Sequence, residues 1–170
     1  MEFNENGMIE PGLHSCTVTE FKQTFVDKFP SSQRRQEIFD CFINFVGKLS
    51  NSYNIHEIWV DGSFVTEKVN PNDVDIIIFL ELEDFIKISP YWSNLRNINN
   101  IDAYCALAVQ EKYRSRLSPV DFNKAINQRN YWRGQFGFDR ADRPKGIMVL
   151  SSVEIDKYLK GGDSDVNGCH

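Results

Sequence analysis

The residues best suited to chemistry lie close together near the middle of the chain. Gly62-Ser63 is followed, after nine residues, by Asp73-Val74-Asp75. Gly62 allows a sharp backbone turn and the close approach of a ligand. We expect Ser63 to begin a short helix, whose free N–H groups, with the Ser63 hydroxyl, favour a phosphate. Residues i and i+2 of a strand share a side, so Asp73 and Asp75 should converge on one spot. Two such carboxylates repel each other unless a cation lies between them, and Mg²⁺ or Mn²⁺ prefers oxygen ligands.

Asp102 is a candidate third carboxylate. It lies near the start of the next predicted strand. If that strand runs parallel to the one that contains Asp75, the two side chains meet at the same end of the sheet. Three carboxylates with two divalent ions form a two-metal site for in-line phosphoryl chemistry. The sequence therefore predicts that Asp73, Asp75 and Asp102 bind metal.

Each of these residues also has a structural interpretation. Gly-Ser dipeptides are common, Asp73 follows Asn72 and can be a turn residue, and Asp102 can cap its strand. Asp75 is harder to explain in this way, because it lies within an apolar run, where an unpaired charge costs several kcal/mol. A buried acid there needs a partner, and a metal ion is an economical one.

Basic residues are concentrated in residues 110–145. This segment holds nine Lys or Arg and four acidic residues, a net charge of +5 in a chain whose total is −5, so the remainder carries −10. Such a region on an acidic protein suggests an anionic ligand, for example a triphosphate or RNA. A solvated helix face with compensating charge explains it equally well. Arg129 and Arg133 lie four residues apart on a predicted helix and are candidates to contact the anion.

Hydrophobic periodicity defines the elements that must position these residues. Helices are predicted over about 17–28, 33–50, 83–97, 119–136 and 152–159, strands over 56–60, 74–80, 101–109 and 146–150, and one or two helical turns over 64–69. This order indicates an α/β or α+β domain, a small mixed sheet with flanking helices. Residues 1–12 are predicted to form a flexible tail, 13–160 a single domain, and 161–170 a disordered tail.

Length and composition exclude several other classes of protein. The chain has 170 residues, of which 41% are hydrophobic and 25% charged, which are ordinary values for one globular domain rather than a disordered chain, coiled coil or fibre. No apolar run reaches the ~20 residues of a membrane span. The first ten residues lack the regions of a signal peptide. The four cysteines are far apart and form no C-x-x-C pair, so we expect a cytoplasmic protein. There is no Walker motif, dinucleotide fingerprint or zinc-finger spacing.

The candidate residues resemble the hallmark of the nucleotidyltransferase superfamily that includes DNA polymerase beta. That hallmark is a Gly-Ser followed by Asp-hydrophobic-Asp, with a third acid on a later strand. Here it is filled by Gly62, Ser63, Asp73, Asp75 and Asp102. A narrower resemblance, to small uncharacterised bacterial nucleotidyltransferase-like proteins, covers roughly residues 11–150. It is carried by Pro11-Gly12-Leu13-His14, by Asp61-Gly62-Ser63-Phe64-Val65-Thr66, and by the segment from Tyr131-Trp132 to Gly146-Ile147.

The resemblance implies a nucleotidyltransferase fold and a metal-dependent transfer of a nucleoside monophosphate from a nucleoside triphosphate to a hydroxyl, with release of pyrophosphate. Asp73 and Asp75 would hold two Mg²⁺ or Mn²⁺ ions, and Ser63 with the backbone after Gly62 would bind the terminal phosphates. Asp102 would bind the second ion and help to deprotonate the attacking hydroxyl.

The resemblance leaves the acceptor open, as an RNA, a protein or a small molecule, because no substrate domain is evident after the core. Lys68 and the basic 110–145 segment would neutralise the triphosphate. Relatives of this type often stand in toxin–antitoxin or phage-defence loci, which suggests a partner protein from the same locus. The alternative is a catalytically silent relative that binds a nucleotide or a partner, as an antitoxin or a regulatory subunit.

Overall fold

A computed structural model describes residues 1–95 and 97–161, which form one α+β domain. The strands are β1 (Gly12–Ser15), β2 (Ile55–Asp61), β3 (Val74–Leu80), β4 (Asn97–Ile98), β5 (Ile101–Leu107) and β6 (Gly146–Ser151). The α-helices are α1 (Val18–Lys22), α2 (Gln33–Ser50), α3 (Leu82–Ile88), α4 (Trp92–Leu95), α5 (Pro119–Phe136) and α6 (Ser152–Gly161). Short helical turns are η1 (Gln23–Asp27), η2 (Ser63–Val65), η3 (Ser89–Tyr91) and η4 (Glu111–Tyr113).

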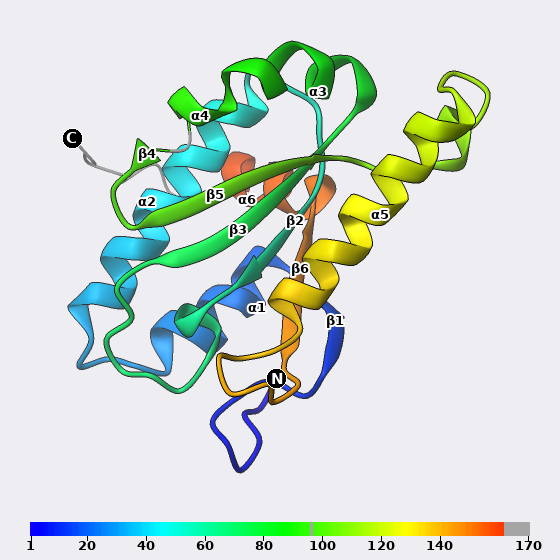
Figure 1. Ribbon diagram of the computed structural model, residues 1–170. Helices are drawn as coiled ribbons and strands as arrows, with labels where there is room; N and C mark the ends of the chain where they lie inside the picture. Colours follow the sequence, from blue (N-terminus) through cyan, green and yellow to red (C-terminus); the bar gives the residue numbers. More distant parts are fainter. Residues whose placement is uncertain (96, 162–170) are drawn as a thin grey trace.

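The strands form a mixed sheet in the order β1-β6-β2-β3-β5-β4 (Figure 1). β2 runs antiparallel to both of its neighbours, β3 and β6. β3 and β5 are parallel, and the chain between them crosses over through α3, η3 and α4. A parallel pair requires such a crossover, and this one brings the starts of β3 and β5 to the same end of the sheet.

Helices cover both faces of the sheet (Figure 1). Alternate strand residues such as Ile58 and Ile76 pack with α1, α2 and α6 on one face. The residues between them, including Trp59 and Ile77, pack with the end of α5 on the other face. Because side chains alternate along a strand, Asp61, Asp75 and Asp102 belong to the α5 face.

Most of the predicted elements are confirmed. α2, β3 and α5 have the predicted bounds, and the Ser32 and Ser118 side chains cap the two long helices by accepting from backbone N–H groups. The helix predicted over 83–97 is divided, with Pro90 in the 3-10 turn that separates α3 from α4. β1 and β4, which are the short edge strands of the sheet, were not predicted.

The prediction of a flexible tail over residues 1–12 is wrong, because this segment packs on the domain. Met8 is 5% exposed and Ile9 is 2% exposed. Met8 forms a β-bridge to Thr66, and β1, which begins at Gly12, pairs with β6. The predicted C-terminal tail, apart from Gly161, lies outside the described residues. None of the helices that the structure describes is both long and apolar enough to cross a membrane.

Candidate active site

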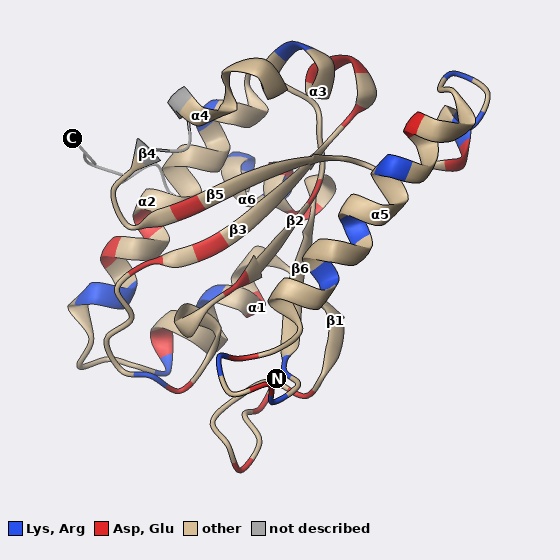
Figure 2. Cartoon of the chain, in the orientation of Figure 1, with Lys and Arg blue, Asp and Glu red and all other residues tan. Residues whose placement is uncertain are grey.

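Three aspartates lie in one row across the ends of three neighbouring strands. Asp61 of β2 pairs in register with Asp75 of β3, and Asp75 pairs in register with Asp102 of β5. Paired residues on neighbouring strands share a face and lie about 5 Å apart. Figure 2 shows the three acidic positions side by side on β2, β3 and β5. The parallel arrangement predicted for Asp75 and Asp102 is therefore confirmed, whereas Asp61 was not among the predicted site residues.

A cavity of about 1030 Å³ opens beside this row. Its lining includes Gly62, Ser63, Asp73 and Asp75, so the structure brings these four predicted residues together. β3 begins at Val74, so Asp73 directly precedes the strand rather than lying within it.

Asp102 does not itself line this cavity but contacts a residue that does. Its Oδ2 accepts a hydrogen bond of 2.8 Å from the hydroxyl of Tyr104, which lies two residues further along β5. The Tyr104 ring packs on Trp132 of α5, with ring centroids 4.5 Å apart. Helix α5 therefore supports the residue that orients Asp102.

Gly62 fits this site for two separate reasons. Its φ is +83°, a conformation that residues with a side chain rarely adopt. A Cβ atom at this position would also lie 1.9 Å from Oδ2 of Asp75. The Asp75 carboxylate thus lies directly against the Gly62 backbone, and the glycine gives it the necessary space.

The carboxylates affect one another electrostatically. Burial, followed by the charges of Asp73 and Asp102, raises the pKa of Asp75 to about 6. Burial also raises the pKa of Asp61 to about 6, although the Lys145 ammonium opposes the shift. Ionisation of the Asp75 carboxyl group therefore costs free energy, and a bound cation would offset this cost.

Asp61 already has a cation. Lys145, which is only 7% exposed, lies 2.8 Å from each of the two Asp61 carboxylate oxygens. The pair joins the end of β2 to the loop that follows α5 and lines the cavity. It therefore fixes that loop beside the row of carboxylates.

Ser63 lies at the start of η2, which is a single 3-10 turn of three residues. A helix of this length has little dipole, and its N-terminus therefore contributes little to the binding of a phosphate. What the turn offers is the Ser63 hydroxyl and its backbone N–H, both at the cavity. The Thr66 hydroxyl closes the turn by donating to the carbonyl of Ser63, at 2.8 Å.

A buried arginine fixes the loop that follows Ser63. Arg35, at the start of α2, is 0% exposed. Its guanidinium donates to four main-chain carbonyls, each at 2.6 Å: those of Phe25, Phe64, Thr66 and Lys68. Its burial lowers its pKa to about 10. No pattern in the sequence indicates this contact, because an arginine in a helical pattern is ordinarily exposed.

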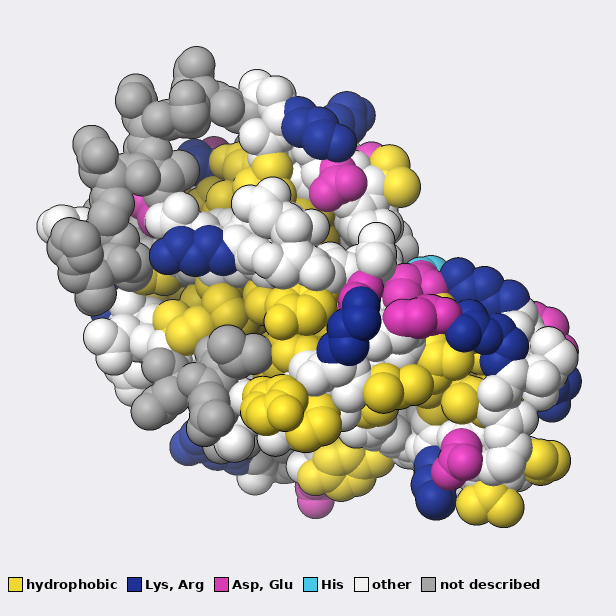
Figure 3. All heavy atoms as spheres, turned by 90° about the horizontal axis from the view of Figure 1, so that it is seen from above, with side chains coloured by type: hydrophobic (Ala, Val, Ile, Leu, Met, Phe, Trp, Pro, Cys, Tyr) yellow, Lys and Arg dark blue, Asp and Glu magenta, His cyan; other side chains and the backbone are white. Residues whose placement is uncertain are grey.

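The basic segment is mostly engaged in ion pairs within the described chain. Seven of its nine basic residues pair with acids: Lys112, Arg114, Arg116, Lys124, Arg129, Arg143 and Lys145. Several of the acids, including Glu57, Asp61 and Glu81, lie outside the segment. Figure 3 shows the molecule from above relative to Figure 1. On the face seen there, basic side chains lie beside acidic ones and form no continuous positive patch. Acidic side chains outside the segment therefore compensate most of its net charge of +5.

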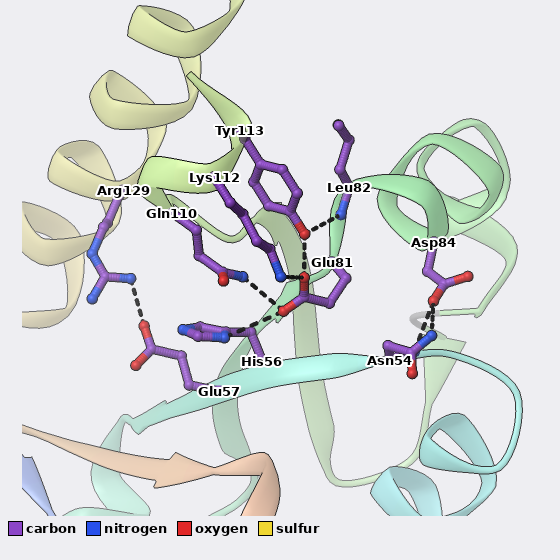
Figure 4. A network of polar contacts seen from close by, with 10 residues as sticks. All are labelled: Asn54, His56, Glu57, Glu81, Leu82, Asp84, Gln110, Lys112, Tyr113 and Arg129. Atoms are coloured by element: carbon purple, nitrogen blue, oxygen red, sulfur yellow. Dashed lines mark hydrogen bonds and ion pairs between the residues drawn. The ribbon is translucent and has the colours of Figure 1, made fainter. Parts of the chain in front are cut away.

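Arg129 illustrates this pairing. Its guanidinium donates to Glu57 at 2.5 Å (Figure 4). It also lies over the Trp59 ring, 4.5 Å from the centroid. Nearby, Glu81 accepts from Lys112, Gln110 and Tyr113. Burial would raise the pKa of Glu81, but these hydrogen bonds lower it to about 2.

The cavity thus receives few of the predicted basic residues. Arg129 and Arg133 do not line it, so the structure does not bring these two to the carboxylates. Lys68 does line it, as does Arg140. Within residues 1–95 and 97–161, neither Lys68 nor Arg140 has an acidic side chain within ion-pair distance.

The donor set suits a divalent cation that also binds a substrate. In the part of the chain that the structure describes, no group of three His, Cys, Asp or Glu side chains is arranged to hold a metal ion by itself. Mg²⁺ commonly binds through one or two carboxylates together with substrate phosphates and water. Asp75, crowded by the charges of Asp73 and Asp102, is the best placed carboxylate for such an ion.

Fold and site together define a small α+β domain with a cavity lined by carboxylates at one end of its sheet. The chain belongs to DUF6932, a family of unknown function whose model matches residues 1–151. No curated protein and no solved structure matches the chain.

Proposed function

We propose that this protein is a metal-dependent nucleotidyltransferase that moves a nucleoside monophosphate from a nucleoside triphosphate to a hydroxyl of an RNA, protein or small-molecule acceptor. One observation carries the proposal: Asp75 and Asp102 are register partners on parallel strands, and Asp75 lies against Gly62 in a cavity that also contains Ser63 and Asp73. A structural role does not account for a carboxyl group, that of Asp75, whose pKa is raised by burial and by the charges of two neighbouring carboxylates.

The residues would divide the chemistry as follows. Two Mg²⁺ or Mn²⁺ ions, when bound, would neutralise the triphosphate and polarise the reacting groups. Asp73 and Asp75 would hold them, with Asp102 as the third carboxylate. The Ser63 hydroxyl and backbone N–H would donate to the terminal phosphates, and the exposed Lys68 would add a positive charge.

In the reaction, the acceptor oxygen forms a bond to the α-phosphorus. The bond from that phosphorus to the oxygen that bridges to the β-phosphate breaks, and pyrophosphate leaves. The proton of the hydroxyl passes to the Asp102 carboxylate. Tyr104 would hold this carboxylate in place through the hydrogen bond that it donates to Oδ2.

A catalytically silent protein that binds a nucleotide or a partner is the second candidate. The Asp61–Lys145 pair favours it, because a buried ammonium already neutralises one carboxylate of the row without a metal ion. Either candidate is compatible with a cytoplasmic role in a bacterial toxin–antitoxin or phage-defence locus, with a partner protein from that locus.

The two candidates separate in one set of measurements. Mn²⁺ and Mg²⁺ are titrated into the protein with each nucleoside triphosphate, and pyrophosphate release is followed with RNA and protein acceptors. An Asp75→Asn variant is the control. We expect metal-dependent nucleotide binding and pyrophosphate release, both lost in the variant. Nucleotide binding without pyrophosphate release would favour the silent protein, and the absence of metal-dependent nucleotide binding would refute the transferase.

A further inference from the structure

The loop after α5 lines the cavity and is unusually well fixed. The Lys145 N–H donates to the carbonyl of Gly137, and Asp139 accepts from the backbone of Ala141 and Arg143. The Asp61–Lys145 pair then anchors the end of the loop. This part of the cavity is therefore held in one shape before any ligand arrives.

Charge pairing leaves one cation on this loop available. Lys145 is neutralised by Asp61, and Arg143 by Asp139, at 2.7 Å. Arg140 is exposed, lines the cavity and has no acidic partner within the described chain. Arg140 and Asp75 line the same cavity.

Aromatic side chains also line the cavity. Phe138 is 48% exposed and directly precedes the loop's Asp139, and Trp132 of α5 is half-buried against Tyr104. All three line the cavity with Arg140. An exposed ring beside a free guanidinium is the combination that recognises a base and its phosphate, through stacking and a charge-assisted contact.

We propose that Phe138 and Arg140 form the subsite for the acceptor, and that the acceptor is a nucleotide unit whose base stacks on Phe138 and whose phosphate contacts Arg140. This inference depends on the proposed function, in which Ser63 and Lys68 bind the triphosphate from a different segment of the cavity wall. It selects a nucleotide-bearing acceptor over a protein side chain. A cavity of about 1030 Å³ has room for one or two such units rather than a long strand.

Tryptophan fluorescence provides a direct test of this subsite. Trp59 is 0% exposed and Trp92 is 7% exposed, so a ligand in the cavity quenches mainly Trp132. The probes are a nucleoside 5′-monophosphate and a three-nucleotide single-stranded RNA, each in Mg²⁺ buffer without a triphosphate. We expect saturable quenching. Equal affinity for the two probes would identify a free nucleotide as the acceptor, and tighter binding of the trinucleotide would identify an RNA end.

Two variants separate the contributions of charge and stacking. Arg140→Gln should weaken binding about tenfold and reduce the slope of log affinity against log salt by about 0.7, the value for one phosphate on a single strand. Phe138→Ser should weaken binding about tenfold and leave the slope unchanged. Arg133→Gln is the matched control, with the same loss of charge outside the cavity, and should behave as the wild type.

Failure of this subsite is distinguishable from failure of the proposed function, because Mn²⁺ is also titrated alone. If Mn²⁺ binds but neither probe quenches, or if Arg140→Gln and Arg133→Gln behave alike, the subsite is refuted while the metal site stands. A protein acceptor would then be favoured. If Mn²⁺ does not bind but the probes do, the nucleotide subsite stands without the transferase.

Discussion

Replacement of Gly62 by alanine tests whether the glycine and the Asp75 carboxylate form one unit. The new Cβ would lie 1.9 Å from Oδ2 of Asp75, whereas real contacts of this kind are essentially never below 3.0 Å. The carboxylate must therefore retreat by about 1 Å, away from the position in which it lies beside Ser63. We expect Gly62→Ala to lose Mn²⁺ and triphosphate binding even though alanine adds only a methyl group.

The same variant should also lose stability, because φ at this position is +83°. With ψ at −167°, this backbone lies in a region that is essentially restricted to glycine, where another residue costs about 1–3 kcal/mol. For a chain of this size, each kcal/mol changes Tm by about 2–4 °C. The expected decrease in Tm is therefore about 2–12 °C, which leaves the protein folded at room temperature and able to be assayed for binding.

Gly134→Ala is the matched control. Gly134 lies within α5, and a Cβ there would meet nothing within 4 Å. The change should stabilise the helix by about 0.5–1 kcal/mol and leave Mn²⁺ affinity unaltered. Calorimetry for Mn²⁺ and thermal unfolding for Tm measure both quantities on both variants. If Gly62→Ala bound Mn²⁺ as tightly as the wild type, the contact between Gly62 and Asp75 would have no part in the site.

Three further changes test other parts of the argument. Because the pKa of Asp75 is about 6, above the ~3.9 of an unfolded aspartate, the metal-free protein should lose stability as pH rises from about 4 to 6. Asp75→Asn should avoid this loss, so that by thermal unfolding it exceeds the wild type at pH 8 and equals it at pH 4. Asp102→Ala should lower turnover by orders of magnitude but leave triphosphate affinity, measured by titration, nearly unchanged. Arg129→Ala should remove the Glu57 contact, destabilise the fold by about 1 kcal/mol in denaturant titrations, and leave triphosphate affinity unchanged.

Periodicity predicted the elements whose pattern is local. α2 and α5 are long and capped by Ser32 and Ser118, and β3 is a continuous buried run, so each has its full signal in its own residues. β1 has only four residues and depends on pairing with β6, more than 130 positions later. Nothing in its own sequence distinguishes it from a polar tail.

The acidic half of the site was predictable for a similar reason. The alignment of Asp75 with Asp102 follows from a parallel crossover, which the helical pattern between the two strands implies. Asp61 directly precedes Gly62-Ser63, and no spacing in the sequence marks it as a carboxylate of the site. Its place in the row depends on the antiparallel register of β2 with β3, which short sequence patterns do not specify.

The basic half of the site was predicted less well, because net charge along a segment says nothing about pairing across the fold. The +5 of residues 110–145 suggested an anion-binding surface, yet acids of β2 and of α3, together with Glu81 at the N-cap of α3, neutralise much of it. Within this loop, Arg143 and Lys145 are paired with acids, and Arg140 is distinguished from them by having no acidic partner in the described chain. The same reasoning applies to Arg35, whose four carbonyl partners lie in η1 and in the segment from η2 to Lys68. In this protein the alignment of the carboxylates can be worked out from strand register. The basic residues available to act with them can be identified only from the tertiary structure, which shows which of them are paired.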